Sequence, residues 1–583
     1  MQRDLNRLAT DAYDVLIIGG GIYGVCVAWD AALRGLSVAL VERGDFGHAT
    51  SSNSLRVIHG GLRYLQYGDL HRLRQSIQER TVFMRIAPHL VHPLPFFIPT
   101  YGHAMRGKEI LALALRINDL IGFNRNRLED PQKYLPPGRI ISREECLRLF
   151  PGIEKKELTG GAIVYDCQLF SSERLILSFA RSANKAGAQV ANYVEVFGLL
   201  RNGERVAGVK ARDLLTGSEI DIRASVVVNT SGPWLDRVLS LCNGHSPNRR
   251  LALSKAFNIL TNRQLIPRYA VGIYTKNRFK DANALLRTGF RLLFVTPWHN
   301  RSLIGTVHLP YDCDPDHCRV TEDEIQSFLD EIKDAYPAAD LKRQDICFTY
   351  GGLLPMDNHG TGGVQLVKRY RIFDYAGLVS VMGVKLTEAR HVAEKTVDRV
   401  FAKLGHMPPK SATATTPLYG GQIQQFSAFL AQEVQSKPRQ VSVDAFQRLI
   451  HLYGSAYPEV LKYLDESSLQ APTGTLTCPT ENAYSFSTSK EEQRAKSFSP
   501  ANESSHAGNP SLIRAEVLHG IREEMVQKLT DVVFRRTSLA IVGNQGDDAL
   551  RRVAAIMSKE LGWDDMRAQR EISEVKRVLS ART

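Results

Sequence analysis

Three glycines near the start of the chain have the spacing of a phosphate-binding turn. Gly19, Gly21 and Gly24 form the pattern G-x-G-x-x-G. In such a turn the first glycine permits a tight bend, the second lets the backbone approach a pyrophosphate, and the third allows close packing of helix and strand. The N-terminus of the following helix then faces the anion. Because glycine-rich turns are common, the flanking segments decide the interpretation.

The flanking segments have the pattern of a βαβ unit. An apolar run at 13–18 predicts a buried strand, 24–33 predicts a helix, and 37–42 predicts a second strand that ends at Glu42. Glu42 stands at the spacing expected of an acid that binds a ribose hydroxyl, which favours FAD or NAD over NADP. We therefore predict a dinucleotide site. The alternative is a structural turn beside a surface glutamate.

Polar residues suited to catalysis follow this unit. Thr50, Ser51 and Ser52 form a hydroxyl cluster, and His59 and Arg63 come shortly after it. A loop of hydroxyl residues or a single histidine has no function by default. The closeness of these residues to the predicted dinucleotide unit, and their mixture of functional groups, make them candidates.

Composition restricts the class of protein. The chain has 583 residues, so about two or three domains are expected. No stretch approaches the roughly 20 apolar residues that cross a bilayer, and the polar segment 1–12 lacks the apolar core of a signal peptide. Eight scattered cysteines favour a reducing, cytoplasmic setting. A net charge of +13 favours an anionic substrate or lipid surface. Nucleic acid is not expected, because no nucleic-acid-binding motif is present.

The hydrophobic pattern changes along the chain from sheet-like to helical. We expect an oxidoreductase region at 1–404, a linker at 405–420, and a helical C-terminal domain at 421–583 with a mobile insertion at about 465–510. Strands are predicted at 189–196, 205–210, 224–229, 291–296, 302–307 and 378–382, and helical segments at 387–404, 441–453 and 514–535.

Short segments spread along the chain resemble the FAD-dependent glycerol-3-phosphate dehydrogenases, which belong to the D-amino-acid-oxidase-like flavoproteins. The similarity runs in order from about 14 to 390 and resumes more weakly at 515–540. The segments are 49–52 (ATSS), 58–65 (IHGGLRYL), 229–234 (NTSGPW), 294–298 (FVTPW), 304–306 (IGT), 384–387 (VKLT) and 535–537 (RRT).

The resemblance implies a fold and a reaction. The fold is an α/β FAD-binding Rossmann-like domain with an interleaved antiparallel-sheet substrate domain, followed by an α-helical C-terminal domain. The reaction is the oxidation of sn-glycerol 3-phosphate to dihydroxyacetone phosphate by hydride transfer from C2 to flavin N5. The electrons then pass to a quinone or to oxygen.

The resemblance also bears on location. It implies peripheral contact with the inner face of the cytoplasmic membrane, for which the apolar segment 107–123 is the candidate helix. The alternative is that this helix packs inside the protein. A homodimer is left open.

The resemblance assigns roles to matching positions. His59, whose ordinary pKa is about 6.5, is the expected base for the substrate hydroxyl. Arg63, one helical turn later, is expected to bind the phosphate, with Lys368 as a second phosphate ligand. Lys385 is expected beside the flavin N1–C2=O edge, where a cation stabilises the reduced flavin. The expected FAD contacts are Gly19, Gly21, Gly24, Glu42, Thr50, Ser51, Ser52, Val194, Val196, Gly232, Lys385, Leu386 and Thr387.

Departures from the family pattern cluster on the substrate side. The family has an arginine where this chain has Leu354, an aspartate where it has His308, and a glycine where it has Val384. A lost charged hydrogen bond costs about 1.5–3 kcal/mol, although Lys368 and Arg369 are available to compensate. Two alternatives therefore stay open. One is a related flavin oxidase or dehydrogenase for another small hydroxy or amino acid, and the other is a non-catalytic flavin-binding regulatory protein.

No metal site is expected. The segment 308–318 contains two histidines and two cysteines, but they lack zinc-binding spacing. Its three aspartates fit a polar turn around Pro315 better than a set of ligands.

Overall fold

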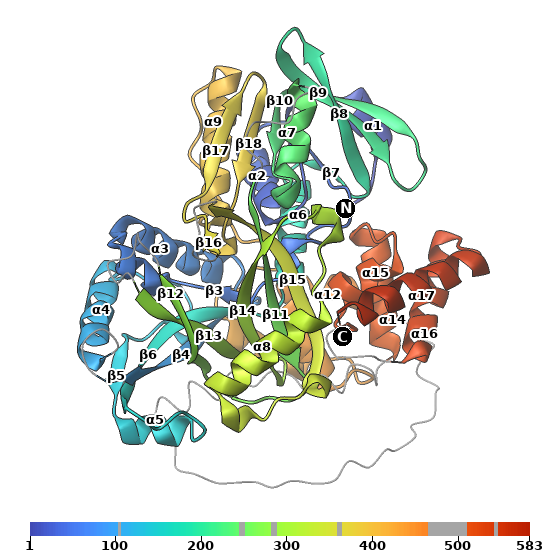
Figure 1. The fold of residues 1–583 in the computed structure, drawn as a ribbon. Coiled ribbons are helices and arrows are strands. Elements are labelled where there is room, and N and C mark those ends of the chain that lie inside the picture. The colour runs from blue at the N-terminus through green and yellow to red at the C-terminus, as the bar shows by residue number, and fades with distance from the viewer. Residues whose placement is uncertain are drawn as a thin grey trace.

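The structure is a computed structural model that describes residues 1–102, 107–243, 251–280, 288–357, 364–464, 510–540 and 546–582. The molecule contains two large sheets, and helices α14 (Pro510–Glu523) to α17 (Asp565–Ser580) lie at one side of them (Figure 1). The insertion predicted at about 465–510 falls outside the described residues except at its last position. Within the described ranges, no helix is long and apolar enough to cross a membrane.

The first sheet contains a parallel core around β1. Both neighbours of β1, β10 and β2, run parallel to it, and α2 (Ile22–Leu33), α6 (Ser172–Lys185) and α9 (Ala389–Leu404) pack together beside it. The apolar runs in its central strands follow from burial on both faces. In spatial order the strands are β17 (Arg371–Tyr375), β18 (Leu378–Met382), β10 (Glu219–Asn229), β1 (Ala12–Ile18), β2 (Val38–Val41) and β7 (Gln189–Ala191), with β9 (Arg205–Asp213) and β8 (Val194–Asn202) joined through β10.

The predicted βαβ unit is confirmed, but the single strand predicted at 189–196 is wrong. Tyr193 adopts a positive φ of 58° and separates β7 from β8. Its N–H donates to the Gly44 carbonyl and its hydroxyl donates to Asp531, so contacts distant in sequence hold this conformation.

The second sheet is antiparallel except for the β12–β4 pair, which confirms the expected substrate-domain architecture. Helix α8 (Glu322–Ala335) covers one face and packs Phe328 against Phe257. In spatial order the strands are β16 (Gln365–Leu366), β15 (Ile346–Asp357), β11 (Leu253–Thr261), β14 (Arg301–Tyr311), β13 (Thr288–Trp298), β12 (Ala270–Lys280), β4 (Val91–Tyr101), β6 (Leu158–Leu169) and β3 (Val57–Ile58), with β5 (Arg139–Ile141) paired to β6.

The C-terminal region is helical, as predicted. The helical stretch predicted at 514–535 is broken, because α14 ends at Glu523 and Met525 adopts a φ of 56°. Before these helices, Leu418 is buried and donates its N–H to the Ile86 carbonyl. The helices are α10 (Phe426–Gln435), α11 (Val443–Tyr453), α12 (Pro458–Leu461), α14 (Pro510–Glu523), α15 (Leu529–Asp531), α16 (Asp547–Leu561) and α17 (Asp565–Ser580), with a π-helical turn at Val532–Arg536.

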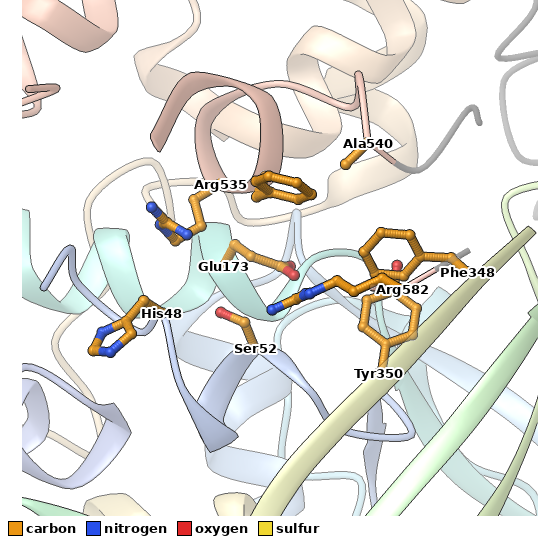
Figure 2. Close-up of a pocket in the computed structure, with 9 residues that line it drawn as sticks. His48, Ser52, Glu173, Phe348, Tyr350, Arg535, Ala540 and Arg582 are labelled. Carbon is orange, nitrogen blue, oxygen red and sulfur yellow. The ribbon is translucent and has the colours of Figure 1, made fainter. Parts of the chain in front are cut away.

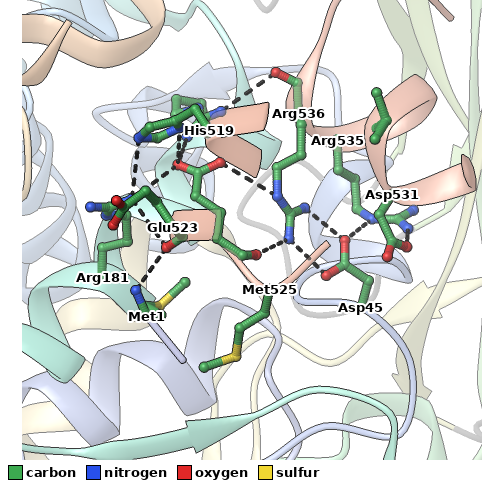
Figure 3. A network of polar contacts seen from close by, with 12 residues as sticks. Met1, Asp45, Arg181, His519, Glu523, Met525, Asp531, Arg535 and Arg536 are labelled. Atoms are coloured by element: carbon green, nitrogen blue, oxygen red, sulfur yellow. Dashed lines mark hydrogen bonds and ion pairs between the residues drawn. The ribbon is translucent and has the colours of Figure 1, made fainter. Parts of the chain in front are cut away.

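A buried ionic network joins the C-terminal helices to the rest of the chain. Arg536 donates to both oxygens of Asp45 at 2.7 and 2.9 Å, and Arg535 also binds this carboxylate (Figure 3). Glu524 forms an ion pair with Arg174 of α6. Although burial opposes ionisation, these arginines lower the pKa of Asp45, and Arg174 and its neighbours lower the pKa of Glu524 to about 2.

We predict that Glu524→Gln destabilises the protein by about 3–5 kcal/mol at pH 7, because it leaves buried guanidinium groups without their counterion. The matched control is Glu560→Gln, which removes a pair with the exposed Arg522. Since the pKa of Glu524 is lowered on folding, its contribution is present above the ordinary glutamate pKa and is lost as pH falls toward 2. Denaturant unfolding at pH 7 and pH 3 measures both effects. A variant as stable as Glu560→Gln at pH 7 would contradict the assignment.

Candidate active site

The glycine turn lies between β1 and α2. Gly19 adopts a φ of 103°, and a Cβ atom on Gly24 would lie 1.8 Å from the Gly19 carbonyl oxygen. The Gly20 N–H donates to one oxygen of Glu42 at 2.6 Å, and the Gly44 N–H donates to the other at 2.7 Å. The bare backbone of this turn and the positive end of α2 fit a pyrophosphate, with Glu42 at its side.

Hydroxyl groups surround the start of α2. Ser51 accepts a hydrogen bond from the Ile22 N–H at 3.0 Å, and Ser52 donates to the Gly47 carbonyl. Thr50 donates to the Leu353 carbonyl on β15 at 2.9 Å. The helix η1 (Thr50–Ser52) therefore joins the glycine turn to the second sheet.

Two of the expected FAD contacts lie on β8, and one lies after β10. The Val194 N–H donates to the Glu42 carbonyl, and the Val194 side chain is buried in the core. Val196 is half-buried and pairs with Ala211 of β9. Gly232 has a φ of 59° at the start of η5 (Gly232–Trp234).

The structure brings His59, Lys385 and Thr387 together. His59 follows β3, and its N–H donates to the Thr387 hydroxyl at 3.3 Å. Its Nδ1 atom is buried and has no hydrogen-bond partner among the described residues. Lys385 precedes η9 (Leu386–Glu388) and donates from Nζ to the hydroxyl of Tyr64. An imidazole nitrogen without a partner is available to accept a proton.

Four cations surround His59. Arg72 pairs with Glu388 and Arg80 pairs with Asp166. Arg63 is exposed and forms no ion pair within the described part of the chain. Burial, followed by the charges of Lys385, Arg72, Arg80 and Arg63, lowers the pKa of His59 to about 3. The imidazole is therefore neutral in the free protein.

Lys385 is also perturbed. Burial and the charge of Arg72 lower its pKa to about 7, while Glu388 opposes this change. The backbone of Lys385 is fixed by Tyr23, whose hydroxyl accepts from the Lys385 N–H at 3.0 Å and donates to the Lys385 carbonyl at 2.7 Å. Tyr23 belongs to the glycine motif, so one side chain connects the cofactor turn with this lysine.

One predicted relation is wrong, and one predicted ligand contacts Tyr67 at the end of η2 (Leu62–Tyr67). His59 is not one helical turn before Arg63 on the same helix, because η2 (Leu62–Tyr67) begins only after Gly61, whose φ is 81°. Lys368 lies with Nζ 4.1 Å from the centre of the Tyr67 ring, at the far end of η2.

Several residues of the site were not singled out from the sequence. Tyr23 and Tyr64 lie inside the quoted motifs, so their positions could have marked them as candidates. The charged residues around His59 could not be recognised from the sequence, because they come close to it only through contacts between segments far apart in the chain. These residues are Arg72, Arg80, Asp166 and Glu388.

A pocket lies where η1, β15 and the C-terminal region meet. Figure 2 shows Glu173 between Arg535 and Arg582. Burial and the charge of Arg535 lower the pKa of Arg582, which also contacts the Phe348 ring. Glu173 is already bound by Arg56 at 2.7 Å, so this pocket is a polar junction between the two regions.

Two of the three aspartates in the turn after β14 form ion pairs. Asp316 binds Arg43 at 2.5 Å and Arg237 at 2.8 Å, and Asp314 binds Arg237 at 2.9 Å. Across the described ranges, no group of three or more metal-ligating side chains gathers. The turn acts as an ionic bridge between the end of β2 and α7 (Leu235–Asn243).

Comparison with known proteins agrees with this arrangement. A family profile described as "FAD dependent oxidoreductase" matches residues 14–398, and one described as "C-terminal domain of alpha-glycerophosphate oxidase" matches residues 411–568. A glycerol-3-phosphate dehydrogenase of Synechocystis is 32% identical and covers 98% of this chain and 97% of its own length. The chain belongs to the FAD-dependent glycerol-3-phosphate dehydrogenase family.

Other members of the family cover nearly the whole chain. The human mitochondrial glycerol-3-phosphate dehydrogenase is 29% identical over 98% of this chain and 73% of its own length. The crystal structure of the Bacillus halodurans glycerol-3-phosphate dehydrogenase with FAD has a TM-score of 0.74 and 26% identity, and covers 99% of this chain and 96% of that one. The family cofactor is FAD, and the glycine turn and Glu42 fit it.

Proposed function

We propose that this protein oxidises sn-glycerol 3-phosphate to dihydroxyacetone phosphate with FAD as cofactor. When bound, FAD accepts the hydride from C2 of the substrate. The observation that carries the proposal is the neutral imidazole of His59, whose Nδ1 atom has no hydrogen-bond partner among the described residues, close to cations that include Lys385 and Arg63. A carbinol substrate needs a base for its hydroxyl proton, and a phosphate needs cations.

His59 acts as the base in this proposal. Burial and the four nearby cations lower the pKa of His59 and make it a weak base in the free protein. A substrate phosphate would offset their charge, and this raises the proton affinity of the imidazole when the substrate is present. The hydroxyl proton then passes to His59 as the hydride leaves C2.

Arg63 and Lys385 provide positive charge. Arg63 is exposed and unpaired within the described ranges, so its guanidinium is available to bind phosphate oxygens. Lys385 is fixed by Tyr23 and Tyr64 and holds its charge close to the reacting groups. The remaining FAD contacts are those expected from the sequence, and Lys368 is proposed as a further phosphate ligand.

The apolar Leu354 in place of the family arginine favours a second candidate, oxidation of another small hydroxy or amino acid by the same site. The electron acceptor is a quinone or oxygen. Anaerobic mixing with glycerol 3-phosphate separates these proposals, because only the first expects rapid bleaching of the flavin absorbance. Bleaching by other hydroxy or amino acids alone supports the second, and no bleaching by any substrate supports a non-catalytic flavoprotein.

We predict that His59→Gln slows flavin reduction by glycerol 3-phosphate about 10²–10⁴-fold, because the variant has no base for the hydroxyl proton. Bound FAD should remain, since the glycine turn that is proposed to hold the pyrophosphate is unchanged. The control is His71→Gln, which changes an exposed histidine on α3 (Leu70–Ile86). Anaerobic stopped-flow absorbance gives the rate. Full-speed reduction in His59→Gln would exclude His59 as the base.

We predict a pH effect from Lys385. Its lowered pKa means that its positive charge is lost as pH rises through about 7. At limiting substrate, flavin reduction should therefore fall between pH 6 and pH 9. Lys385→Arg keeps its charge and should lack this fall, whereas Lys385→Met should be slow throughout. The second ionisation of the substrate phosphate affects wild type and both variants equally, so a difference between their pH profiles reports on residue 385. Identical profiles for wild type and Lys385→Arg would show that the fall does not come from Lys385.

We also propose that α4 (Lys108–Ile121) lies against a membrane surface. Only Leu115 of this helix is buried, while Leu113 and Leu120 are 59% and 76% exposed. Phe123, just beyond the helix, is 72% exposed. An amphipathic helix with such a face binds lipid by burying these side chains.

We predict that a Leu113→Ser, Leu120→Ser, Phe123→Ser variant loses most of its binding to vesicles of phosphatidylcholine and phosphatidylglycerol. Flotation measures binding, and flavin reduction in solution should not change. The control is Met566→Ser, which removes an equally exposed apolar side chain on α17. Equal flotation of the triple variant and wild type would show that α4 is not the contact.

A further inference from the structure

Three adjacent strands of the second sheet form a patch of small residues. In the order β14, β11, β15, His308 lies opposite Ala256, and Ala256 lies opposite Gly352. In the next row, Ser254 lies opposite Leu354. Because alternate residues of a strand point to one face, Ser254 and Ala256 share a face with these neighbours. We call the surface over Ala256, between His308 and Leu354, the small-residue floor.

The floor faces the FAD-binding elements. Lys255, between its two residues on β11, points the other way and pairs with Glu324 of α8. On the floor side, a Cβ atom on Gly352 would lie 3.0 Å from the Cα atom of Thr50 in η1. The floor therefore lies beside the hydroxyl cluster that adjoins the glycine turn.

His308 borders this floor with a ring nitrogen that has no hydrogen-bond partner among the described residues. This nitrogen, Nδ1, is buried. Two charged groups act on it, Arg291 from β13 and Arg63 from η2, and burial followed by these two charges lowers its pKa to about 4. Arg291 is paired with Glu331 at 3.2 Å, whereas Arg63 has no ion pair in the described ranges. Arg63 also acts on His59.

The two changes from the family pattern lie on opposite sides of the floor. Neighbouring strands are about 4.8 Å apart, so His308 and the strand of Leu354 are separated by about 10 Å across β11. The resemblance implies an arginine at 354 and an aspartate at 308, and the strand register would place both of these charged side chains on the face that carries Ala256. In this chain, position 354 is a leucine and position 308 is a neutral histidine, so neither charge is present. The Nδ1 atom of this histidine has no hydrogen-bond partner among the described residues.

We propose that this chain binds the phosphate of its substrate over Ala256, between the His308 imidazole and the Arg63 guanidinium, in place of the family arginine at 354. This proposal rests on the proposed function, because it names the phosphate subsite of the same site. The phosphate dianion favours protonated His308, so binding takes up one proton from solvent onto the imidazole. His308 then donates a charged hydrogen bond to a phosphate oxygen.

Inorganic phosphate and the substrate test this subsite in the FAD-loaded enzyme. His308→Ala should weaken phosphate binding about 10–100-fold, as followed by the flavin absorbance change, and raise the KM for glycerol 3-phosphate by a similar factor. Slow turnover of glycerol, which has no phosphate, should not change. Calorimetry in buffers of different ionisation enthalpy should record proton uptake in wild type and none in His308→Ala.

Further variants distinguish the loss of the His308 contact from a general loss of folding. His317→Ala, at an exposed histidine in the turn after β14, should behave as wild type. His308→Gln keeps most of the side-chain volume but cannot become charged, so it should lose proton uptake even if His308→Ala folds poorly. Adding Leu354→Arg to His308→Gln should restore phosphate affinity, because both positions face the same anion. If Leu354→Arg does not restore phosphate affinity, the proposal that positions 308 and 354 face the same phosphate is wrong.

The outcomes are distinct from those of the proposed function. If glycerol 3-phosphate does not reduce the wild-type flavin, the proposed reaction fails, while phosphate affinity still reports on His308. If wild type is reduced but the His308 variants bind phosphate normally, the subsite is overturned. A fall in kcat for glycerol and glycerol 3-phosphate alike, with KM unchanged, would also overturn it.

Discussion

Unbalanced positive charge around His59 is the constraint on which the site depends. Arg72 and Arg80 form ion pairs with Glu388 and Asp166, whereas Lys385 and Arg63 form no ion pair within the described ranges. Burying an uncompensated cation costs several kcal/mol, and a group that can release its proton does so. Burial first, and then these neighbouring charges, lower the pKa of Lys385 to about 7 and keep His59 neutral. An anionic substrate relieves the imbalance, so the same charges that weaken the base in the free protein favour a phosphorylated substrate.

The fold holds this charge in place by connecting it to the glycine turn. Tyr23 extends from the first turn of α2 and bonds both backbone groups of Lys385. A Cβ atom on Gly383 would lie 2.1 Å from the Tyr23 ring, so glycine is required just before this segment. Since the turn is expected to bind the pyrophosphate and Lys385 the flavin end, a single tyrosine fixes the distance between the two ends of the cofactor site.

Local structure could be predicted from the sequence, whereas the breaks within predicted elements and the electrostatic environment of His59 could not. The βαβ unit follows from short-range pattern, and β18 has the predicted bounds because its apolar run is bordered by turn residues. Tyr193 and Met525 break predicted elements with positive φ values that non-glycine residues rarely adopt. The resemblance brought His59 and Lys385 into one site, but the pKa of His59 depends on arginines supplied by other segments.

The C-terminal helices bear on the cofactor site through one loop. Glu42 and Asp45 lie three residues apart after β2, and Gly44 donates to the Glu42 carboxylate. Arg535 and Arg536 hold Asp45 from the C-terminal region. A buried carboxylate with two guanidinium partners tolerates little displacement, because any shift exposes unpaired charges to a medium of low polarity. The position of Glu42 beside the glycine turn is therefore set partly by residues almost 500 positions away. The C-terminal helices support the cofactor site through the loop that carries Glu42 and Asp45.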